Sequence, residues 1–592
     1  MADFFLYNYK NKIDLESLES VFIRKGLSHP LKIRFGVWML LLYPKMLVDE
    51  PNIIYGALDQ FAFCIGTISY HSQCSRKSLS LLNNDYYAGC IDKDELIGNY
   101  CVGFWDGRLL TLMTDQLNLQ HVFVNTSATC LSSSFLALLA SSSFPLRLNR
   151  MAVHEKLASG YIVAPDTLVE GIIQLNYELA SWLEENSSIK LINKNPYFSL
   201  HSSKNQRFED SVDVCCEVLK SYFNKIQPIA SEYRAELGLS NGYDSRLLLA
   251  LSGSFPFSIP LHSHHTIKVH EYELDIAQKL ASIGGNVCRV IPTKRLEDQD
   301  EDTRRKIIMD NLYFFDGRCI HDMGHFSETY TAGYRKMVLG DNRLSLNGLG
   351  GESYRNVYTT PIGRFDWNDW QDYSVFFPFA IQASENIDSF LSMRAHRNAK
   401  IEKRIGCDLS ATVDYYTIRQ YYSLVRMPDC AGNVCNAFNQ VAYMLTPFIE
   451  PLTVREVLSV SSSNIGVDGK FEAALIQKLS PKLAAVSSQY GHSFSVVPNR
   501  YLVKAHIKAA IPLRMRTERK RKSLALVLQN QVGSADYPKV VANSCFINEL
   551  AQVLRDTFPT SDWVLSMCNE NQMRTSLYIA SFINEFRHKL IL

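Results

Sequence analysis

The spacing of apolar and polar residues changes near residue 205, and the two parts of the chain predict different kinds of structure. Between residues 50 and 195, short apolar or alternating runs are separated by Gly, Asn, Asp and Ser. Such runs are typical of β-strands joined by turns. The clearest of them are Phe61–Ile68, Cys101–Trp105, Leu109–Met113 and His121–Asn125. We therefore expect β-rich layers in this part and a domain boundary near residue 205.

Beyond residue 205, strand patterns alternate with helix patterns. A helical pattern begins at Phe208, runs toward Phe223 and leads into Ala235–Leu239, which predicts a short buried strand. The elements expected next are an apolar helix from Leu247, a strand over Pro256–His265, a helix over Glu271–Ile283 and a strand over Val287–Ile291. Alternating strands and helices are typical of a parallel sheet, so the fold class is α/β. From residue 370 onward the pattern is mainly helical.

The segment between the first of these strands and its helix is short and polar. It consists of Ser240, Asn241, Gly242, Tyr243, Asp244 and Ser245. We expect Gly242 to adopt torsions that a side chain would forbid, and the free N–H groups of the helix start to bind an anion. Asp244 would repel a phosphate unless a cation lay between them, so the segment predicts magnesium-bound pyrophosphate. A plain strand-to-helix turn with a polar cap is the alternative.

Size and composition add few limits. A chain of 592 residues is too long for one core, and roughly two to four domains are expected. The net charge of +1 favours neither a nucleic-acid nor a membrane partner. The first residues do not resemble a signal peptide, no apolar run reaches about 18 residues, and the 14 cysteines follow no metal-binding spacing. We expect a soluble, cytoplasmic protein with reduced thiols.

The Ser240–Ser245 segment resembles the PP-loop of ATP pyrophosphatases, whose usual form is SGGxDS. Asn241 stands at the second position, where its tolerance of left-handed torsions makes it acceptable. A second glycine-rich turn, Asn347–Arg355, follows the apolar run Met337–Leu339. In the asparagine synthetase superfamily a GxGxDE segment follows the PP-loop at about this distance, and its Asp binds magnesium. The resemblance implies that Glu352 takes this position, and two carboxylates suit a cation that keeps several waters.

Other segments resemble the same superfamily in the same order. Gly98–Asp106, Asp115, Ser132–Leu139 and Asp166–Ile172 are similar to its glutaminase-type domain. Leu445–Glu450 resembles its VPFLD turn, and Lys470 stands where a lysine contacts the ATP phosphates. The resemblance implies two domains. Residues 1–205 would form a β-rich, glutaminase-like sandwich of the N-terminal nucleophile type, and residues 206–592 a PP-loop ATP pyrophosphatase domain with a parallel sheet and a helical extension.

Three departures from the superfamily pattern narrow the function. Ala2 stands where an active glutaminase needs cysteine, so this domain is expected to be inactive and to supply no ammonia. Leu349 replaces the tyrosine of β-lactam synthetases and the glutamate of asparagine synthetases. The stretch Ser487–His492 lacks the lysine expected near the chemistry. An adenylating site without an ammonia source suits an intramolecular amine, and the chain looks most like the lasso peptide macrolactam synthetases, or lasso cyclases.

This resemblance implies an ATP- and Mg²⁺-dependent, AMP-forming ligase. It would adenylate an Asp or Glu side chain of a precursor peptide, which the peptide's N-terminal amine then attacks after a partner leader peptidase has removed the leader. The implied catalytic residues are Asp244, Glu352, Lys470, Tyr354 and Arg355, with Asp244 and Glu352 as metal ligands. The implied ATP contacts are Ser240, Asn241, Gly242, Tyr243, Asp244, Ser245, His262, Gly348 and Gly350. An amide ligase for a small substrate and a non-catalytic binding protein remain the alternatives.

Three further features have two interpretations each. His262, His264, His265 and His270 are either metal ligands or a polar strand end where this superfamily binds adenine, and His262 and His264 should share one face of the strand. Tyr354 and Arg355 either reach the reacting carboxylate or are structural. The basic run is either a solvated helix face or a contact for a peptide or partner protein. It consists of Arg514, Arg516, Arg519, Lys520, Arg521 and Lys522.

Overall fold

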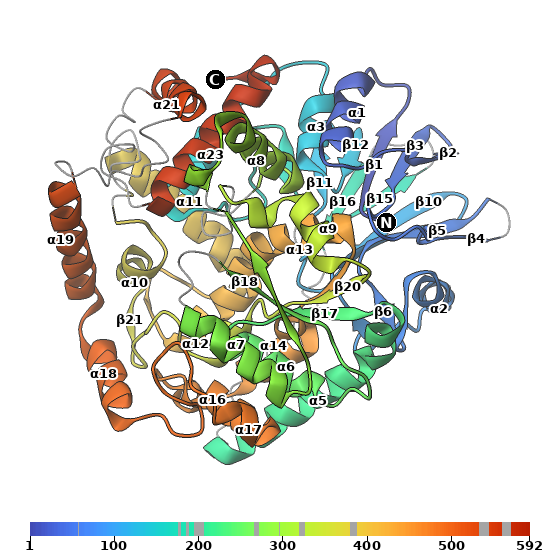
Figure 1. Cartoon of the computed structure of the whole chain (residues 1–592). Coiled ribbons are helices and arrows are strands. Elements are labelled where there is room, and N and C mark those ends of the chain that lie inside the picture. The colour runs from blue at the N-terminus through green and yellow to red at the C-terminus, as the bar shows by residue number, and fades with distance from the viewer. Residues whose placement is uncertain are drawn as a thin grey trace.

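The computed structural model shows a mixed α/β protein (Figure 1). It describes residues 1–56, 59–175, 179–184, 189–193, 206–265, 271–294, 296–318, 326–378, 380, 387–531, 544–558 and 570–592. The boundary expected near residue 205 adjoins residues outside these ranges. None of the described helices is long and apolar enough to cross a membrane.

Two six-stranded antiparallel sheets form the N-terminal part. The first has the order β14-β11-β12-β1-β3-β2, with β1 Asp3–Asn8, β2 Leu31–Phe35, β3 Trp38–Tyr43, β11 Phe123–Asn125, β12 Cys130–Ser132 and β14 Ile172–Gln174. The second has the order β16-β15-β10-β9-β5-β4, with β4 Ile53–Tyr55, β5 Phe61–Gly66, β9 Tyr100–Trp105, β10 Leu109–Thr114, β15 Leu179–Glu184 and β16 Ile189–Asn193. The four strands predicted most clearly are thus confirmed.

The two sheets pack face to face between layers of helices. Phe4 of β1 and Phe63 of β5 lie in the core between the sheets, where their rings are 5.8 Å apart. Because neighbouring strand residues point to opposite faces, Phe5 lies in the core shared with α1 (Leu15–Arg24) and α3 (Phe135–Ser141). Ala62 likewise lies in the core shared with α2 (Ser75–Ala88). Apolar residues on both faces of these strands therefore build a helix–sheet–sheet–helix sandwich.

A five-stranded parallel sheet organises the second part. Its order is β19-β18-β17-β20-β23, with β17 Ala235–Gly238, β18 Leu261–His265, β19 Cys288–Pro292, β20 Leu344–Leu346 and β23 Tyr443–Leu445. The chain runs outward from β17 through β18 to β19, then returns to the other side of β17 with β20 and β23. The topological switch point therefore lies between β17 and β20, and ligands of such sheets bind beyond the carboxyl ends of the strands at this point.

The helices around this sheet follow the prediction with two differences. The elements α5 (Phe208–Glu232) and α7 (Glu271–Ile283) occur where they were expected. Helix α6 (Tyr243–Ser252) begins at Tyr243 rather than Leu247, which puts the carboxylate of Asp244 in the first turn, where the helix dipole favours it. Strand β18 begins at Leu261 rather than Pro256, because a proline donates no backbone hydrogen bond to a ladder.

Helices dominate after residue 370, as predicted. The remaining helices are α4 Arg150–Ser159, α8 Glu301–Phe314, α9 Ala332–Leu339, α10 Trp367–Ser374, α11 Ile387–Ile405, α12 Tyr415–Tyr421, α13 Gly432–Val441, α14 Pro451–Ser459, α15 Ser462–Ile465, α16 Lys470–Leu479, α17 Pro481–Ala484, α18 Asn499–Ala510, α19 Leu513–Gln531, α21 Cys545–Thr557 and α23 Glu570–Phe586. A π-helix, η4 (Tyr422–Ala431), joins α12 to α13.

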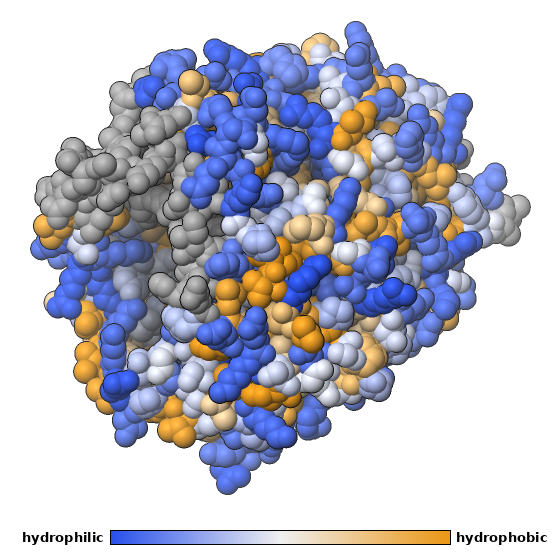
Figure 2. Space-filling view, in the orientation of Figure 1, coloured by the Kyte–Doolittle hydropathy of each residue, from blue (hydrophilic) through white to orange (hydrophobic). Residues whose placement is uncertain are grey.

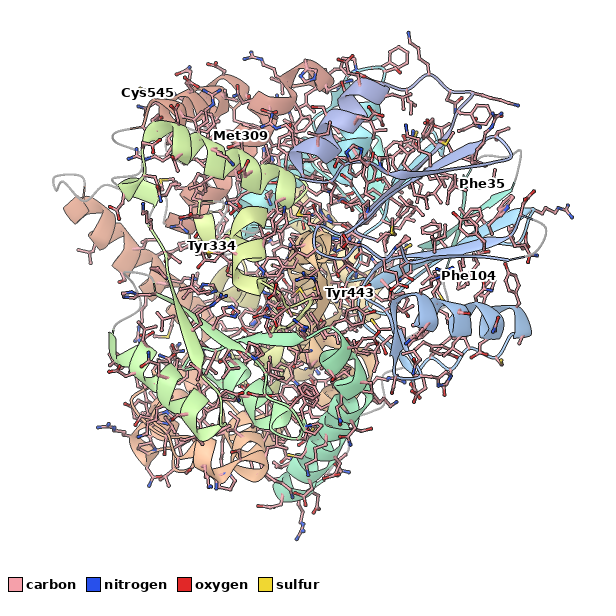
Figure 3. The ribbon with its side chains drawn as sticks, turned by 45° about the vertical axis from the view of Figure 1, so that its right-hand side comes forward. Phe35, Phe104, Met309, Tyr334, Tyr443 and Cys545 are labelled. Atoms are coloured by element: carbon pink, nitrogen blue, oxygen red, sulfur yellow. The ribbon has the colours of Figure 1, made fainter. Side chains whose placement is uncertain are left out.

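Polar contacts join the N-terminal sandwich to the parallel sheet. In Figure 3, Tyr443 of the edge strand β23 lies in the middle of the molecule, and its hydroxyl donates to Ser75 of α2 at 3.0 Å. The buried carboxylate of Glu450 accepts from the Gly98 amide at 3.1 Å and from the Tyr222 hydroxyl at 3.2 Å. The two parts therefore meet through specific hydrogen bonds as well as apolar packing.

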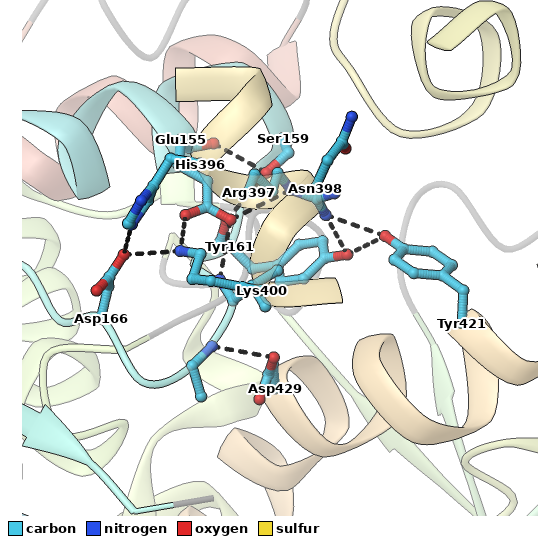
Figure 4. A network of polar contacts seen from close by, with 12 residues as sticks. Glu155, Ser159, Tyr161, Asp166, His396, Arg397, Asn398, Lys400, Tyr421 and Asp429 are labelled. Carbon is cyan, nitrogen blue, oxygen red and sulfur yellow. Dashed lines mark hydrogen bonds and ion pairs between the residues drawn. The ribbon is translucent and has the colours of Figure 1, made fainter. Parts of the chain in front are cut away.

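A second polar network joins α4 to α11 and α12 (Figure 4). The fully buried Arg397 pairs with Glu155 at 3.2 Å and donates to the hydroxyls of Tyr161 at 2.7 Å and Tyr421 at 3.0 Å. Lys400 lies 2.7 Å from Glu155 and 2.8 Å from Asp166. These charges are out of water, so each depends on its partner.

We expect Arg397→Met to lower the free energy of unfolding by about 3–5 kcal/mol, because the change removes one partner of a buried ion pair. Lys306→Met is the matched control, since Lys306 pairs with Asp310 on an exposed face of α8 and such pairs contribute about 1 kcal/mol or less. Urea unfolding of the three proteins measures both effects. Equal losses in the two variants would contradict the structural role of Arg397.

Glu450 should make the stability depend on pH. Burial raises the pKa of its carboxyl to about 8, whereas a glutamate in the unfolded chain ionises near about 4.3. The folded protein thus holds a proton that the unfolded chain releases, so this contribution to stability is present at low pH and is lost as the pH rises toward 8. Relative to wild type, Glu450→Gln should therefore gain about 1–3 kcal/mol between pH 5 and pH 8. Urea unfolding at both pH values tests this, and a pH-independent difference contradicts it.

Candidate active site

Two loops meet at the switch point of the parallel sheet. The Ser240–Ser245 segment follows β17, and the turn that contains Gly348 and Gly351 follows β20. A Cβ atom on Gly351 would lie 2.1 Å from Asp244 Oδ1, and one on Gly348 would lie 3.2 Å from Asp244 Cβ. The second turn therefore packs directly on Asp244, and glycine is required there because a side chain would collide with the carboxylate.

Arg355 joins the two loops to a third element. Its Nη1 lies 2.5 Å from Asp244 Oδ1 and its Nη2 lies 3.2 Å from Asp244 Oδ2, so the guanidinium binds this carboxylate with two hydrogen bonds. The same Nη1 lies 2.5 Å from Glu472 Oε2 on α16. Arg355 and Asp244 belong to the residues predicted from the sequence, and the structure brings them into direct contact.

Glu472 was not predicted from the sequence. Its side chain is fully buried, and burial raises the pKa of its carboxyl well above the usual range, while Arg355 lowers it and Asp244 raises it further. A signal for it does exist in the sequence. Glu472 shares one face of α16 with Leu475, Ile476 and Leu479, and a carboxylate on an otherwise apolar helix face marks a buried charge.

Glu352 is the third carboxylate, in the short helix η3 (Gly351–Tyr354). The Tyr422 hydroxyl donates to its Oε2 at 2.6 Å. Burial raises the pKa of the Glu352 carboxyl, and the charge of Asp244 raises it further. Tyr422, which the sequence did not indicate, begins the π-helix η4, an irregularity that occurs often at functional sites. Its neighbour Tyr421 belongs to the network of Figure 4, so adjacent residues contact both clusters.

The charges of this cluster do not balance. Three carboxylates, Asp244, Glu352 and Glu472, face the single guanidinium of Arg355. Glu472 Oε1 is buried and has no hydrogen-bond partner among the described residues. Protons or a cation must compensate for the excess negative charge. Carboxylate oxygens suit Mg²⁺, which needs only one or two of them from the protein, so Asp244 and Glu352 fit such an ion.

The same geometry sets a condition on a bound cation. Within the part of the chain that the structure describes, no three His, Cys, Asp or Glu side chains are arranged to hold a metal. Both oxygens of Asp244 already accept from Arg355. A cation bound to Asp244 therefore shares this carboxylate with the guanidinium or displaces it.

The Ser240–Ser245 segment is held by its own hydroxyls and by Arg246. The Ser245 hydroxyl accepts from the Ser240 amide at 3.0 Å and lies 2.8 Å from the Ser240 hydroxyl. Arg246 is fully buried and donates to the carbonyls of Asn241, Leu483, Val486 and Ser487. No side chain caps α6, so its first N–H groups are open to an anion.

The conformational reason given for Gly242 is wrong. Its φ of −84° and ψ of −170° are extended torsions that any residue adopts, and a Cβ there would make only ordinary contacts with Ser240 and Gln489. Asn241 is buried and is not among the residues with positive φ, so a tolerance of left-handed torsions is not needed either. The carbonyl of Asn241 instead accepts from Arg246.

Several residues predicted for the site lie outside the charged cluster. Lys470 is exposed, with its ammonium 5.1 Å from the centre of the Phe208 ring. Tyr354 is buried in the core, with its ring 5.6 Å from that of Phe448. Gly350 has a φ of +87°, and a Cβ on it would lie 2.1 Å from Ile449 Cγ2. Tyr243 is buried, and its ring stacks on that of Phe494 with 3.9 Å between the ring centres. The guanidinium carbon of Arg355 lies 5.3 Å from the centre of the Tyr243 ring.

The histidines form a separate group. The rings of His262 and His264 are 5.1 Å apart, which confirms that they share one face of β18. His262 Nδ1 lies 2.6 Å from Glu236. Burial raises the pKa of the Glu236 carboxyl, but His262 and Arg335 lower it more strongly and hold it at about 2. Burial lowers the pKa of His264 to about 4, and its Nδ1 contacts the Tyr334 hydroxyl at 2.9 Å. His270 lies outside the described residues.

Comparison with known proteins gives no match to a family model and none to a curated protein. What supports a function for this site is therefore its own position in the fold and the chemistry of its residues.

Gly351→Ala should disturb the site, because its Cβ would displace the Asp244 carboxylate from Arg355. We expect the free energy of unfolding to fall by about 1–3 kcal/mol, as is usual when a packed region must accept an extra methyl group. Gly363→Ala is the control, since a Cβ there meets no atom within 4 Å. Urea unfolding measures both, and equal stabilities of the two variants would show that the loops are not packed as described.

Proposed function

We propose that this protein is an ATP-dependent ligase that forms an amide bond by adenylating a carboxyl group, and that it closes a macrolactam ring in a ribosomally made peptide. The observation that carries the proposal is the meeting of two loops, with Asp244 and Glu352, beyond adjacent strands at the switch point of a parallel sheet. In this proposal the parallel sheet is a PP-loop domain and the N-terminal sandwich is a glutaminase-like domain of the N-terminal nucleophile type.

The chemistry explains why such a site needs both an anion-binding loop and carboxylates. A carboxylate and an amine do not condense in neutral water, because hydroxide is a poor leaving group. When the substrate carboxylate attacks the α-phosphate of ATP, pyrophosphate leaves and an acyl adenylate forms. The amine then attacks the acyl carbon, the C–N bond forms, AMP leaves with the electrons of the C–O bond, and the amine loses a proton.

Each part of the site has a role in this scheme. The open N–H groups at the start of α6, with the hydroxyls of Ser240 and Ser245, would bind the leaving phosphates. Asp244 and Glu352 would hold Mg²⁺, which supplies charge stabilisation for departing pyrophosphate when bound. Arg355 orients Asp244 and neutralises Glu472. The family resemblance also assigns Lys470 to the phosphates, but its ammonium lies beside the Phe208 ring, apart from the cluster, so the scheme gives it no role.

The alanine at position 2 supports a reaction in which the substrate itself supplies the amine. Ala2 is buried, and its amide donates to the Tyr43 carbonyl at 2.8 Å. Its methyl group offers no nucleophile for the hydrolysis of glutamine. A peptide that carries both the carboxyl group and the amine needs no ammonia, and holding the two groups together in one site would supply much of the rate.

Asp244→Asn should reduce ATP–pyrophosphate exchange by at least about 10²-fold, because it removes a ligand of the charge-stabilising cation. The assay contains ATP, Mg²⁺ and a candidate precursor peptide, and circular dichroism checks that the variant is folded. Asp341→Asn, on an exposed turn, is the control and should keep wild-type exchange. Undiminished exchange in folded Asp244→Asn would exclude this site as the adenylating centre.

The product identifies the substrate class. Incubation with ATP, Mg²⁺, a leader peptidase and the precursor peptide should give a peptide lighter by one water, together with AMP. Amidation of a small acid with free ammonia, without loss of water from the peptide, would indicate an amide ligase for small substrates. No AMP with any of these substrates would indicate a non-catalytic binding protein.

A further inference from the structure

Helix α18 exposes apolar side chains where a surface helix normally carries polar ones. It has no buried residue, and Val503 and Ile507 are 55% and 61% exposed. Arg500, Lys504 and Lys508 follow at intervals of four residues along the same side of the helix, next to the two aliphatic residues. A face on which aliphatic and cationic side chains alternate is suited to a partner that supplies both apolar contacts and negative charge.

Helix α19 repeats this pattern and shows which basic residues are free. Met515 and Leu526 are 47% and 59% exposed, and Arg519 and Lys522 lie between them on the same side at helical spacing. Arg519 and Lys522 are exposed and have no hydrogen-bond or ion-pair partner among the described residues.

The other members of the basic run anchor α19 to the body of the protein. Arg514 pairs with Asp369 at 2.9 Å, and Arg516 donates to the Thr359 carbonyl at 2.7 Å. The remaining two also donate to carbonyls of the body, Lys520 to Tyr373 and Arg521 to Pro378. Four cations of the basic run therefore hold the helix to the body of the protein, and the other two, Arg519 and Lys522, have no partner among the described residues.

The start of α18 lies beside the candidate active site. The Tyr501 ring packs on that of His492 at 4.9 Å, and a Cβ on Gly491 would lie 3.2 Å from the Tyr501 hydroxyl. In the same turn, Gln489 lies next to Gly242 of the anion-binding segment. Figure 1 shows α18 and α19 in succession along one edge of the molecule, and Figure 2 shows apolar side chains among hydrophilic ones on that edge.

We propose that the exposed faces of α18 and α19 form a docking surface for an acidic segment of the peptide substrate that carries aliphatic side chains. We call this the α18–α19 surface, and define it by Arg500, Val503, Lys504, Ile507, Lys508, Met515, Arg519, Lys522 and Leu526. The proposal rests on the proposed function, since it names the part of the peptide that binds away from the reacting groups. Glu518 is the one acidic residue between 499 and 531, so the charge of this surface calls for an anionic partner.

The position and size of the α18–α19 surface favour a peptide over a membrane as its binding partner. Among the side chains that the structure describes, each helix exposes two large apolar ones on this surface and none of them is Trp or Phe, which is little apolar area for holding a protein on a bilayer. Twelve helical residues span about 18 Å, so a peptide bound along α18 keeps its free end within a few extended residues of Gly242. Such tethering raises the local concentration of the reacting groups at the site.

Fluorescence anisotropy tests the surface with a defined probe and the full-length protein. The probe is a fluorescein-labelled 15-residue peptide with Glu and Leu at helical spacing, and the matched probe carries Lys in place of Glu. We expect Lys504→Glu with Lys508→Glu, and separately Val503→Ser with Ile507→Ser, to weaken binding of the acidic probe at least tenfold. Lys10→Glu with Lys12→Glu, on an exposed turn of the N-terminal part, is the charge-matched control and should bind it as wild type does.

Three results would overturn the proposal. These are equal affinity of wild type and the Lys504/Lys508 variant for the acidic probe, equal affinity of wild type for the acidic and lysine probes, and preferential binding to vesicles of three parts phosphatidylcholine to one part phosphatidylglycerol. The binding assay needs no ATP. Failure of wild type to bind the acidic probe while its ATP–pyrophosphate exchange is intact would therefore refute the surface alone. Binding of the probe by wild type without any exchange would refute the proposed function alone.

Discussion

Three carboxylates share one guanidinium at the carboxyl edge of the parallel sheet, and the surrounding structure is arranged around this shortage of positive charge. Arg355 contacts Asp244 and Glu472 only because two glycine-containing turns bring η3 against the first turn of α6. Glu472 cannot remain buried and ionised without that guanidinium. The cluster therefore fixes the relative positions of α6, η3 and α16, and its excess of carboxyl groups over guanidinium is what protons or the proposed cation would balance.

The N-terminal sandwich is joined to this cluster through the protein interior. Arg397 and Tyr161 hold Tyr421, and the next residue, Tyr422, donates to Glu352. A domain proposed to have lost its own chemistry thus still contributes to the geometry of the site, because the π-helix that begins at Tyr422 is supported from its side. This contact links the N-terminal part to the geometry of the cluster, whatever residue stands at position 2.

Much of the fold could be predicted from the sequence. The antiparallel strands β5, β9, β10 and β11, the parallel strands β17 and β19 and the helices α5 and α7 follow from apolar periodicity, which is a local property of the chain. The apolar run from Leu247 predicts a start for α6 that is four residues too late, because Asp244 already stabilises the first turn of the helix through the helix dipole. The expectation that Gly242 adopts torsions forbidden to a side chain is wrong, because its backbone is extended and a glycine in a turn does not always mark unusual torsions.

The sequence by itself predicted the α/β class and the two polar turns, because apolar periodicity and glycine spacing are local properties of the chain. Its resemblance to a known superfamily singled out Asp244, Glu352 and Arg355 as candidate site residues. Only the tertiary structure decided that Arg355 binds Asp244, that Glu472 and Tyr422 complete the cluster, and that Lys470 and Tyr354 lie apart from it. It also divided the basic run into four cations that bind the body of the protein and two without a partner among the described residues. The reason is that a charge acts through its neighbours in space, and residues 244, 355, 422 and 472 become neighbours only when the strands they follow or pack against assemble into one sheet.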